Sequence, residues 1–358
     1  MSQGALRFHV GSYSMPSPWA AAPDGHGAGI ALAELDLATG GMTVLDAWRD
    51  DDPAYIVSAP EAGLLWTTAE VVPGGELVGY RVGRDGVLGE DRRVVTGADG
   101  PCYVHVDLAH GLAIAAHYRG RRFSVVSLAD GLPDRVLQLI DTPEAPGGVE
   151  RGELVPRPHS AVTVGEFIVA ADCGRDALLL YAIDAGSAVP LRLVDALALP
   201  EGTGPRHLAY DQRRGVVYAS NQNRAGISVV SVDQAAQRLE LRQIIASPGL
   251  GRGDSLPSEI ALHPTLDLIY IANRRDESIS SFAIDAESGV LTPHATTDVL
   301  GAWPRHFRIT PEADFLLVAN QNSDQVVSFA LDAEGALEWT GRRLDIATPT
   351  MIRYWPAA

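Results

Sequence analysis

The tripeptide Pro-Arg-His occurs twice in the sequence, within "GPRHLAY" and again within "WPRHFRI". Each copy directly precedes an apolar run with the composition of a β-strand. The arginines of the two copies, Arg206 and Arg305, could bind a carboxylate or a phosphate, because a guanidinium group pairs with such anions through two parallel hydrogen bonds. The histidines, His207 and His306, could gain or lose a proton near neutral pH. The repeated tripeptide therefore indicates either an anion-binding site or a repeated structural contact.

The proline of the tripeptide belongs to a longer series. Seven prolines that lead into strand-like runs stand 45 to 57 residues apart, at Pro53, Pro101, Pro158, Pro205, Pro257, Pro304 and Pro349. In several units a second β-rich run follows, such as "GVVYASNQN" or "DLIYIANRR". A third run, such as "ISVVSVD", "ISSFAID" or "VVSFALD", alternates as a half-buried strand does. With a fourth run after a turn, each unit predicts four strands. The repeat thus predicts an all-β fold, a seven-bladed β-propeller with four antiparallel strands per blade.

The two ends of the chain share one unit. Only one strand, "TMIRY", follows Pro349, whereas three runs, "LRFHVGSY", "IALAELD" and "MTVLDAW", precede Pro53. We therefore expect strands from both termini to close the ring, which leaves no unpaired sheet edge. The chain length alone favours two domains, but the repeat predicts a single domain over residues 1–358.

Equivalent positions of the repeat predict which side chains meet. Each innermost strand begins at its proline and the second strand ends near it, so residues just after both points gather at one mouth of the channel. At the ends of the second strands, the candidates are Glu70, Gln222 and Arg274. At the two positions after the proline, the Arg, His and Glu side chains crowd into units three to six, and they are His159, Arg206, His207, Glu259, Arg305 and His306. A symmetric architecture does not require this unevenness, whereas a ligand seated off-centre does.

Two interpretations of these residues remain open. As a site, Arg206, Arg274 and Arg305 would bind an anion, and His159 would act as a general acid or base. The side chains expected to assist substrate binding are Glu70, His207, Glu259 and His306. As architecture, arginines and histidines would bridge neighbouring blades through carboxylates such as that of Glu259. The identical placement of the two histidines after their arginines favours this packing role for them.

The composition excludes several classes of function. The formal net charge of −17 argues against a nucleic-acid partner, because phosphate binding needs clustered Lys and Arg. No run resembles a metal-binding or nucleotide-binding motif, so we predict no metal and no cofactor. The two cysteines, Cys102 and Cys173, suggest no disulfide framework. The start of the sequence lacks the pattern of a secretory leader and no apolar run approaches a membrane span, so we expect a cytoplasmic protein without a membrane partner.

From Pro101 to Tyr354 the chain resembles the lactonase-type seven-bladed propeller family, which includes bacterial 6-phosphogluconolactonase and the fungal carboxymuconate cyclases. The segments that carry the resemblance include "GPRHLAYDQRRGVVYASNQN", "RPHSAVTVGEFIVAADCGRD" and "WPRHFRITPEADFLLVANQNSDQVVSFALD". The resemblance implies four active residues: a histidine, an arginine, a glutamate and a second arginine. In this sequence they fall on His159, Arg206, Gln222 and Arg274, so an amide stands where the family has a carboxylate.

The replacement at Gln222 bears on the chemistry, because a carboxylate exchanges a proton whereas an amide only donates and accepts hydrogen bonds. Another acid, Glu259 or Glu70, would have to serve, or the reaction would differ. The resemblance implies a metal-independent hydrolase that opens a sugar lactone of the 6-phosphogluconolactone type, or a similar anionic lactone. The alternatives are a lactone-forming cycloisomerase of the carboxymuconate type and a non-catalytic propeller that binds an anion or a protein. A carboxylate in the same mouth as His159 would favour an enzyme over the binding propeller.

Overall fold

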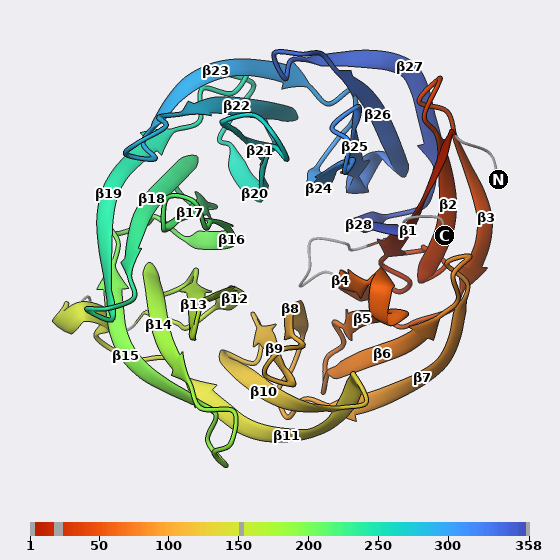
Figure 1. Ribbon diagram of the computed structural model, residues 1–358. Coiled ribbons are helices and arrows are strands. Elements are labelled where there is room, and N and C mark those ends of the chain that lie inside the picture. Colours follow the sequence, from red (N-terminus) through yellow and green to blue (C-terminus); the bar gives the residue numbers. More distant parts are fainter. Residues whose placement is uncertain (1–3, 18–23, 150–153, 356–358) are drawn as a thin grey trace.

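The computed structural model describes residues 4–17, 24–149 and 154–355. They form seven four-stranded antiparallel sheets, here called blades, which are arranged in a ring (Figure 1). Blade 1 comprises β4 (Pro53–Ala59), β5 (Leu64–Ala69), β6 (Glu76–Val82) and β7 (Leu88–Val95). Blade 2 comprises β8 (Pro101–Asp107), β9 (Leu112–His117), β10 (Arg122–Ala129) and β11 (Leu132–Asp141). Blade 3 comprises β12 (Pro158–Val164), β13 (Phe167–Asp172), β14 (Ala177–Ile183) and β15 (Leu191–Ala198). Blade 4 comprises β16 (Pro205–Asp211), β17 (Val216–Asn221), β18 (Gly226–Asp233) and β19 (Arg238–Ala246). Blade 5 comprises β20 (Leu256–Leu262), β21 (Leu268–Arg274), β22 (Ser278–Ile284) and β23 (Leu291–Asp298). Blade 6 comprises β24 (Pro304–Ile309), β25 (Phe315–Asn320), β26 (Gln325–Leu331) and β27 (Leu337–Asp345).

Blade 7 contains strands from both ends of the chain. Its order is β28 (Pro349–Trp355), β1 (Ala5–Ser12), β2 (Ile30–Asp36) and β3 (Met42–Trp48), with β28 innermost (Figure 1). β28 and β1 are antiparallel, and Arg7 lies opposite Trp355. The predicted seven-bladed propeller, closed by strands from both termini, is therefore confirmed.

Each innermost strand starts beside the end of the strand that pairs with it. Pro205 lies opposite Asn221, and Pro304 lies opposite Asn320. The register shifts just after each of these prolines, which marks a local irregularity of the kind that redirects side chains. The residue that follows the second strand is thereby placed next to the residues that follow the proline, so both sets surround one mouth of the channel.

The third strands differ from the expectation of half-buried strands. β18, β22 and β26 are buried along nearly their whole length, because they are packed between neighbouring blades. Ser228 and Ser328, at their alternating polar positions, are fully buried. Their hydroxyl groups are satisfied inside the ring: Ser228 donates to Asn221 Oδ1 at 3.0 Å, and Ser328 donates to the carbonyl of Gly40 at 2.7 Å. The exposed faces belong instead to outermost strands such as β7.

Helical structure in the described residues is limited to three short 3₁₀ turns, at Pro60–Ala62, Pro146–Gly148 and Gln321–Ser323. Within these parts of the chain, no helix has the length and apolar character needed to span a membrane.

Candidate active site

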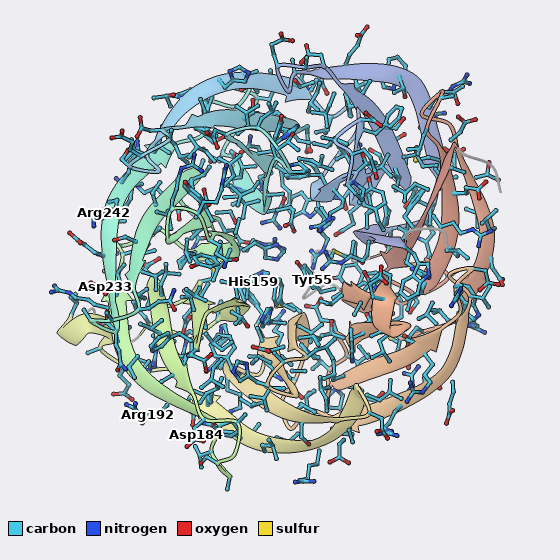
Figure 2. All side chains as sticks on the ribbon, in the orientation of Figure 1. Tyr55, His159, Asp184, Arg192, Asp233 and Arg242 are labelled. Carbon is cyan, nitrogen blue, oxygen red and sulfur yellow. The ribbon has the colours of Figure 1, made fainter. Side chains whose placement is uncertain are left out.

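A cavity of about 220 Å³ lies at the mouth where the innermost strands begin. The residues that line it are Glu70, Cys102, Tyr118, His159, Arg206, Gln222, Leu256, Arg274, Trp303 and Arg305. Figure 2 shows His159 near the centre of the ring, whereas Arg192, Asp233 and Arg242 lie at its rim. Six of the residues predicted from the repeat therefore share one cavity: Glu70, His159, Arg206, Gln222, Arg274 and Arg305.

The guanidinium group of Arg206 has unused hydrogen-bond donors. Arg206 follows the proline at the start of β16 and is only 3% exposed. Its Nε and Nη1 atoms are buried and have no hydrogen-bond partner within the described residues. Burial, and then the positive charge of Arg305, lower the pKa of Arg206 to about 10, so the side chain is still charged at neutral pH. A buried cation with two unused donors is suited to bind an oxyanion.

The imidazole of His159 is in its neutral form near neutral pH. Burial is the main reason that the pKa of His159 lies well below its usual value, and the charge of Arg206 lowers it further. The ring makes edge contacts with Tyr118 and His207, with centroids 5.7 and 5.2 Å away. Its Nδ1 lies 3.9 Å from Sγ of Cys102. A neutral imidazole at a cavity wall can accept a proton from a bound water molecule.

Glu70 provides a carboxylate in the same cavity as His159. It lies directly after β5 and is 4% exposed. The hydroxyl of Tyr13 donates a hydrogen bond of 2.6 Å to Oε2 of Glu70, and Nη2 of Arg305 lies 3.8 Å from the same oxygen. Burial raises the pKa of Glu70, and the charge of Arg305 and the hydrogen bond from Tyr13 oppose this shift. A carboxyl group with a raised pKa is a candidate proton donor.

Gln222 fixes the position of Arg274. Nη2 of Arg274 donates to Oε1 of Gln222 at 2.8 Å and to the carbonyl of Pro257 at 3.1 Å. Nε of Arg274 donates to the carbonyl of Leu256 at 2.9 Å, and the guanidinium carbon lies 5.2 Å from the centroid of the Trp303 ring. The amide at position 222 thus orients a cation at the cavity wall, and it can do so without the negative charge of a glutamate.

Glu259, His207 and His306 lie beside the cavity rather than on its wall. Oε2 of Glu259 is 2.8 Å from Nδ1 of His207 and 3.2 Å from Nε2 of His306. Burial lowers the pKa of both histidines, to about 3 for His306, so each ring is neutral and can donate one N–H to the shared carboxylate. The separation occurs where the register of the innermost strands shifts just after the proline, between Pro205 and Leu208 in β16 and between Pro304 and His306 in β24. In the Pro-Arg-His tripeptide, the arginine therefore contributes to the cavity and the histidine bridges blades through Glu259.

Sequence reasoning missed several residues of the cavity. Cys102 and Tyr118 line the cavity and stand at the same repeat positions as the predicted residues. They were not predicted because only Arg, His, Glu and Gln side chains at these positions were selected. Tyr13 directly follows β1 in blade 7, the position that Glu70 has in blade 1. Counting the repeat backwards through the N-terminal strands could have found it. Trp303 has no counterpart in this pattern, and nothing in the repeat marks it.

The arrangement combines the groups that acyl hydrolysis needs. A neutral imidazole, a carboxyl group with a raised pKa and a guanidinium group with unused donors share one small cavity. Three guanidinium groups, those of Arg206, Arg274 and Arg305, face one carboxyl group, so the cavity favours anions. In the part of the chain that the structure describes, no three His, Cys, Asp or Glu side chains form a cluster that could hold a metal ion.

Comparisons with known proteins agree with this architecture. Two 6-phosphogluconolactonases are similar in sequence: that of Bacillus subtilis (strain 168) is 25% identical over 264 residues, which cover 72% of this chain and 73% of the relative. That of Pectobacterium carotovorum is 26% identical over 280 residues, which cover 76% and 79%. Among solved structures, the periplasmic gluconolactonase PpgL of Pseudomonas aeruginosa superposes with a TM-score of 0.88 and 26% identity, over 99% of this chain and 100% of that one. The family model described as "Lactonase, 7-bladed beta-propeller" matches residues 7–354. The chain therefore belongs to the lactonase family of seven-bladed β-propellers.

Proposed function

We propose that this protein is a hydrolase that opens an anionic sugar lactone of the 6-phosphogluconolactone type. The observation that carries the proposal is the buried guanidinium group of Arg206, whose Nε and Nη1 have no partner within the described residues and which lines the same cavity as His159 and Glu70. The names of the relatives from Bacillus subtilis and Pectobacterium carotovorum support the substrate class. A carboxyl group in the cavity of His159 also favours an enzyme over a propeller that only binds anions.

In the first step, neutral His159 takes a proton from a water molecule while the water oxygen attacks the lactone carbonyl carbon. The carbonyl oxygen becomes an oxyanion, which accepts hydrogen bonds from Arg206. One such donor is commonly worth about 10²–10³-fold in rate, because it is aimed at charge that develops only in the transition state.

In the second step, the tetrahedral intermediate collapses and the bond between the carbonyl carbon and the ring oxygen breaks. Glu70, in its protonated form, gives its proton to the departing ring oxygen, which becomes a hydroxyl group. The product is a hydroxy acid. His159 then releases its proton to solvent and Glu70 takes one from solvent, which restores both groups for the next turnover. The environment raises the pKa of Glu70 and lowers that of His159. At a given pH these shifts favour the protonated carboxyl group and the neutral imidazole, the forms that a general acid and a general base require.

Arg274 and Arg305 provide positive charge for the anionic group of the substrate. Arg274 is fixed by backbone carbonyls and by Gln222, and Arg305 is fixed by Tyr13. Because neither guanidinium group has to be reoriented, the substrate is positioned at little cost in conformational entropy. In this proposal Glu259, His207 and His306 support the cavity from behind and do not touch the substrate.

The test is a hydrolysis assay that follows proton release at pH 7, with the spontaneous rate subtracted. The panel contains 6-phosphoglucono-δ-lactone, glucono-δ-lactone and the uncharged δ-valerolactone. We expect turnover of the phosphorylated lactone with the highest kcat/KM, and loss of this turnover in His159→Ala. Turnover absent for every lactone would contradict the proposal, and conversion of an unsaturated diacid to a lactone would assign the protein to the cycloisomerases.

A further inference from the structure

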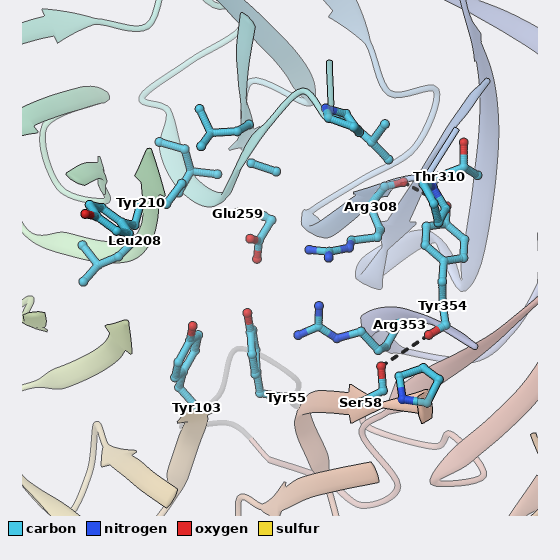
Figure 3. A pocket seen from close by; sticks show the side chains of 18 residues that line it. Tyr55, Ser58, Tyr103, Leu208, Tyr210, Glu259, Arg308, Thr310, Arg353 and Tyr354 are labelled. Atoms are coloured by element: carbon cyan, nitrogen blue, oxygen red, sulfur yellow. Dashed lines mark hydrogen bonds between the residues drawn. The ribbon is translucent and has the colours of Figure 1, made fainter. Parts of the chain in front are cut away.

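A second and larger cavity opens towards the opposite end of the innermost strands. It has a volume of about 590 Å³, and we call it the vestibule. Its polar lining residues are Tyr55, Ser58, Tyr103, Tyr210, Glu259, Arg308, Thr310, Arg353 and Tyr354. Figure 3 shows the side chains of Arg308 and Arg353 extending towards the middle of this space, where they face Glu259 and Tyr55. No residue proposed to touch the lactone lines the vestibule.

The two arginines are an asymmetric feature of a symmetric fold. Arg308 and Arg353 both stand four residues after the proline of their innermost strand, on the adjacent strands β24 and β28. The same position in the other five blades carries Val57, His105, Val162, Ala209 and Ala261. Five blades pack without a cation at this place, so the propeller fold does not require one. Two cations on adjacent strands therefore indicate a ligand rather than architecture.

The two guanidinium groups have few partners in the protein. Nε of Arg353 donates to the carbonyl of Ile56 at 3.1 Å, and no other hydrogen bond or ion pair of this guanidinium group occurs within residues 4–17, 24–149 and 154–355. In the same parts of the chain, the Arg308 guanidinium group makes none at all. The one carboxylate of the lining, that of Glu259, is engaged by two histidines. The formal charges of the lining are thus two positive and one negative, which leaves room for one anionic charge.

The environment of Arg353 also favours a bound anion. Burial is the main cause that lowers the pKa of Arg353 to about 10, and the nearby charge of Arg308 lowers it further. The arginine is still charged at neutral pH, so two like charges are held together at the wall of a cavity. An oxyanion between them would relieve this repulsion and would accept their unused N–H groups.

A layer of packed rings separates the vestibule from the cavity of His159. The rings of Tyr55 and Tyr103 are 4.0 Å apart between centroids. His207 makes edge contacts with both tyrosines and with His159, at 5.5, 5.2 and 5.2 Å between centroids. The two cavities therefore lie on opposite sides of one layer, and a ligand of the vestibule does not compete directly for the lactone site.

We propose that the vestibule is a second binding site, which takes the carboxylate of a small hydroxylated monoacid. The carboxylate would lie between Arg308 and Arg353, and hydroxyl groups of the ligand would reach Glu259 and the tyrosine hydroxyls. The charge balance favours a single negative charge, and the volume is in the range of small-molecule sites. This inference does not depend on the proposed hydrolysis.

The test is isothermal titration calorimetry of the full chain with sodium gluconate, at ionic strength held constant with sodium chloride. Sorbitol, which has the hydroxyl groups without the carboxylate, is the control ligand. We expect gluconate to bind to Arg206→Ala, in which the other cavity has lost its oxyanion donor, and sorbitol not to bind. Arg308→Gln should weaken gluconate binding about tenfold or more, because a charged hydrogen-bonding group is lost, whereas Arg308→Lys should weaken it less.

Arg308 is the primary site for substitution because, among the described residues, its guanidinium group forms no hydrogen bond or ion pair that folding could depend on. A melting curve of each variant checks that it is folded. Three outcomes would overturn the proposal: no gluconate binding, equal binding of sorbitol, or gluconate binding that Arg206→Ala abolishes and Arg308→Gln leaves intact. None of these bears on lactone hydrolysis, which the assay of proton release tests separately.

Discussion

The hydroxyl of Tyr13 donates a hydrogen bond of 2.6 Å to Glu70 and accepts one of 2.5 Å from Arg305. The three residues belong to blades 7, 1 and 6, so one hydroxyl group joins three blades at the wall of the cavity. Glu70 is therefore held in place by both a neutral donor and a cation. It stands three blades away from Gln222, where members of the family are expected to carry their glutamate.

Glu70→Gln should lower kcat/KM for the phosphorylated lactone by about 10²–10⁴-fold, because a positioned acid is lost. The amide can still accept the hydrogen bond from Tyr13, so the melting temperature should change little. In the wild type, kcat/KM should fall as pH rises through the raised pKa of Glu70, since the proton donor is then lost. This alkaline decline should be absent in Glu70→Gln. A pH–rate profile of the variant with the wild-type shape would remove Glu70 from the mechanism.

Gln222→Glu should not raise turnover, because in the proposed mechanism Glu70 provides the acid and a new carboxylate would neutralise Arg274. We expect a higher KM for the anionic lactone, of about tenfold, which corresponds to the loss of roughly one charged hydrogen bond. The double variant Glu70→Gln with Gln222→Glu is the sharper measurement. If the double variant regains the activity that Glu70→Gln lost, position 222 can serve as the site of the acid. A gain of tenfold or more in the single variant would show that Glu70 does not fill this role.

Arg206→Ala should reduce kcat about 10²–10³-fold with a smaller effect on KM, because its donors act on the oxyanion of the transition state. Arg206→Lys keeps the charge but loses the paired geometry of the guanidinium group, so it should restore only part of kcat. Steady-state kinetics of both variants measure this split. A rise in KM at unchanged kcat would instead place Arg206 in the binding of the ground-state substrate.

Trp355→Ala should destabilise the protein by about 3–5 kcal/mol, the usual cost of removing a large buried aromatic side chain. Trp355 is 2% exposed at the end of β28, where its ring makes an edge contact with His9 on β1. Trp339→Ala is the matched control, because Trp339 is 54% exposed on the outermost strand β27. Denaturant unfolding of both variants gives the comparison. Equal stability of the two would mean that β28 contributes little to ring closure.

The stability of the fold should fall as pH decreases below the usual pKa of histidine. Burial lowers the pKa of His9 from 6.5 to about 4, so the unfolded chain binds a proton between these values and the folded chain does not. The contribution of neutral His9 to the free energy of unfolding is fully present above pH 6.5. It is lost as pH falls to 4, by about 3 kcal/mol in total. His9→Gln should reduce the loss of unfolding free energy between pH 7 and pH 4.5, whereas a glutamine at exposed His294 should not. An unfolding free energy that falls with pH by the same amount in His9→Gln and in the wild type would contradict this.

The fold could be predicted from the sequence because the repeat carries both the period and the ring closure. Each proline marks the start of an innermost strand, and counting from it located Glu70, Gln222 and Arg274 at the ends of second strands. The same count could not separate Arg206 from His207, because it used position along the chain and not the direction of the side chain. These neighbours stand where the register of β16 shifts, so the direction of each side chain depends on a local irregularity that the spacing of the repeat does not reveal.

Other features depend on contacts that sequence spacing does not encode. The link between Tyr13, Glu70 and Arg305 joins three blades, and it depends on how the ends of the ring meet. The burial of Ser228 and Ser328 depends on the neighbouring blade, since a local pattern of alternation is the same whether the second face meets water or another sheet.

Ring closure has a consequence for biosynthesis. Tyr13 and Thr348 are 335 residues apart in the chain, yet the backbone of Tyr13 is hydrogen-bonded on both sides by Thr348, which directly precedes β28. A nascent chain that has been synthesised only as far as blade 6 contains Glu70 and Arg305 but lacks the segment that fixes the tyrosine between them. The cavity is therefore completed only once the segment around Thr348 has been made, and enzymatic activity would report on synthesis of this segment as well as on folding.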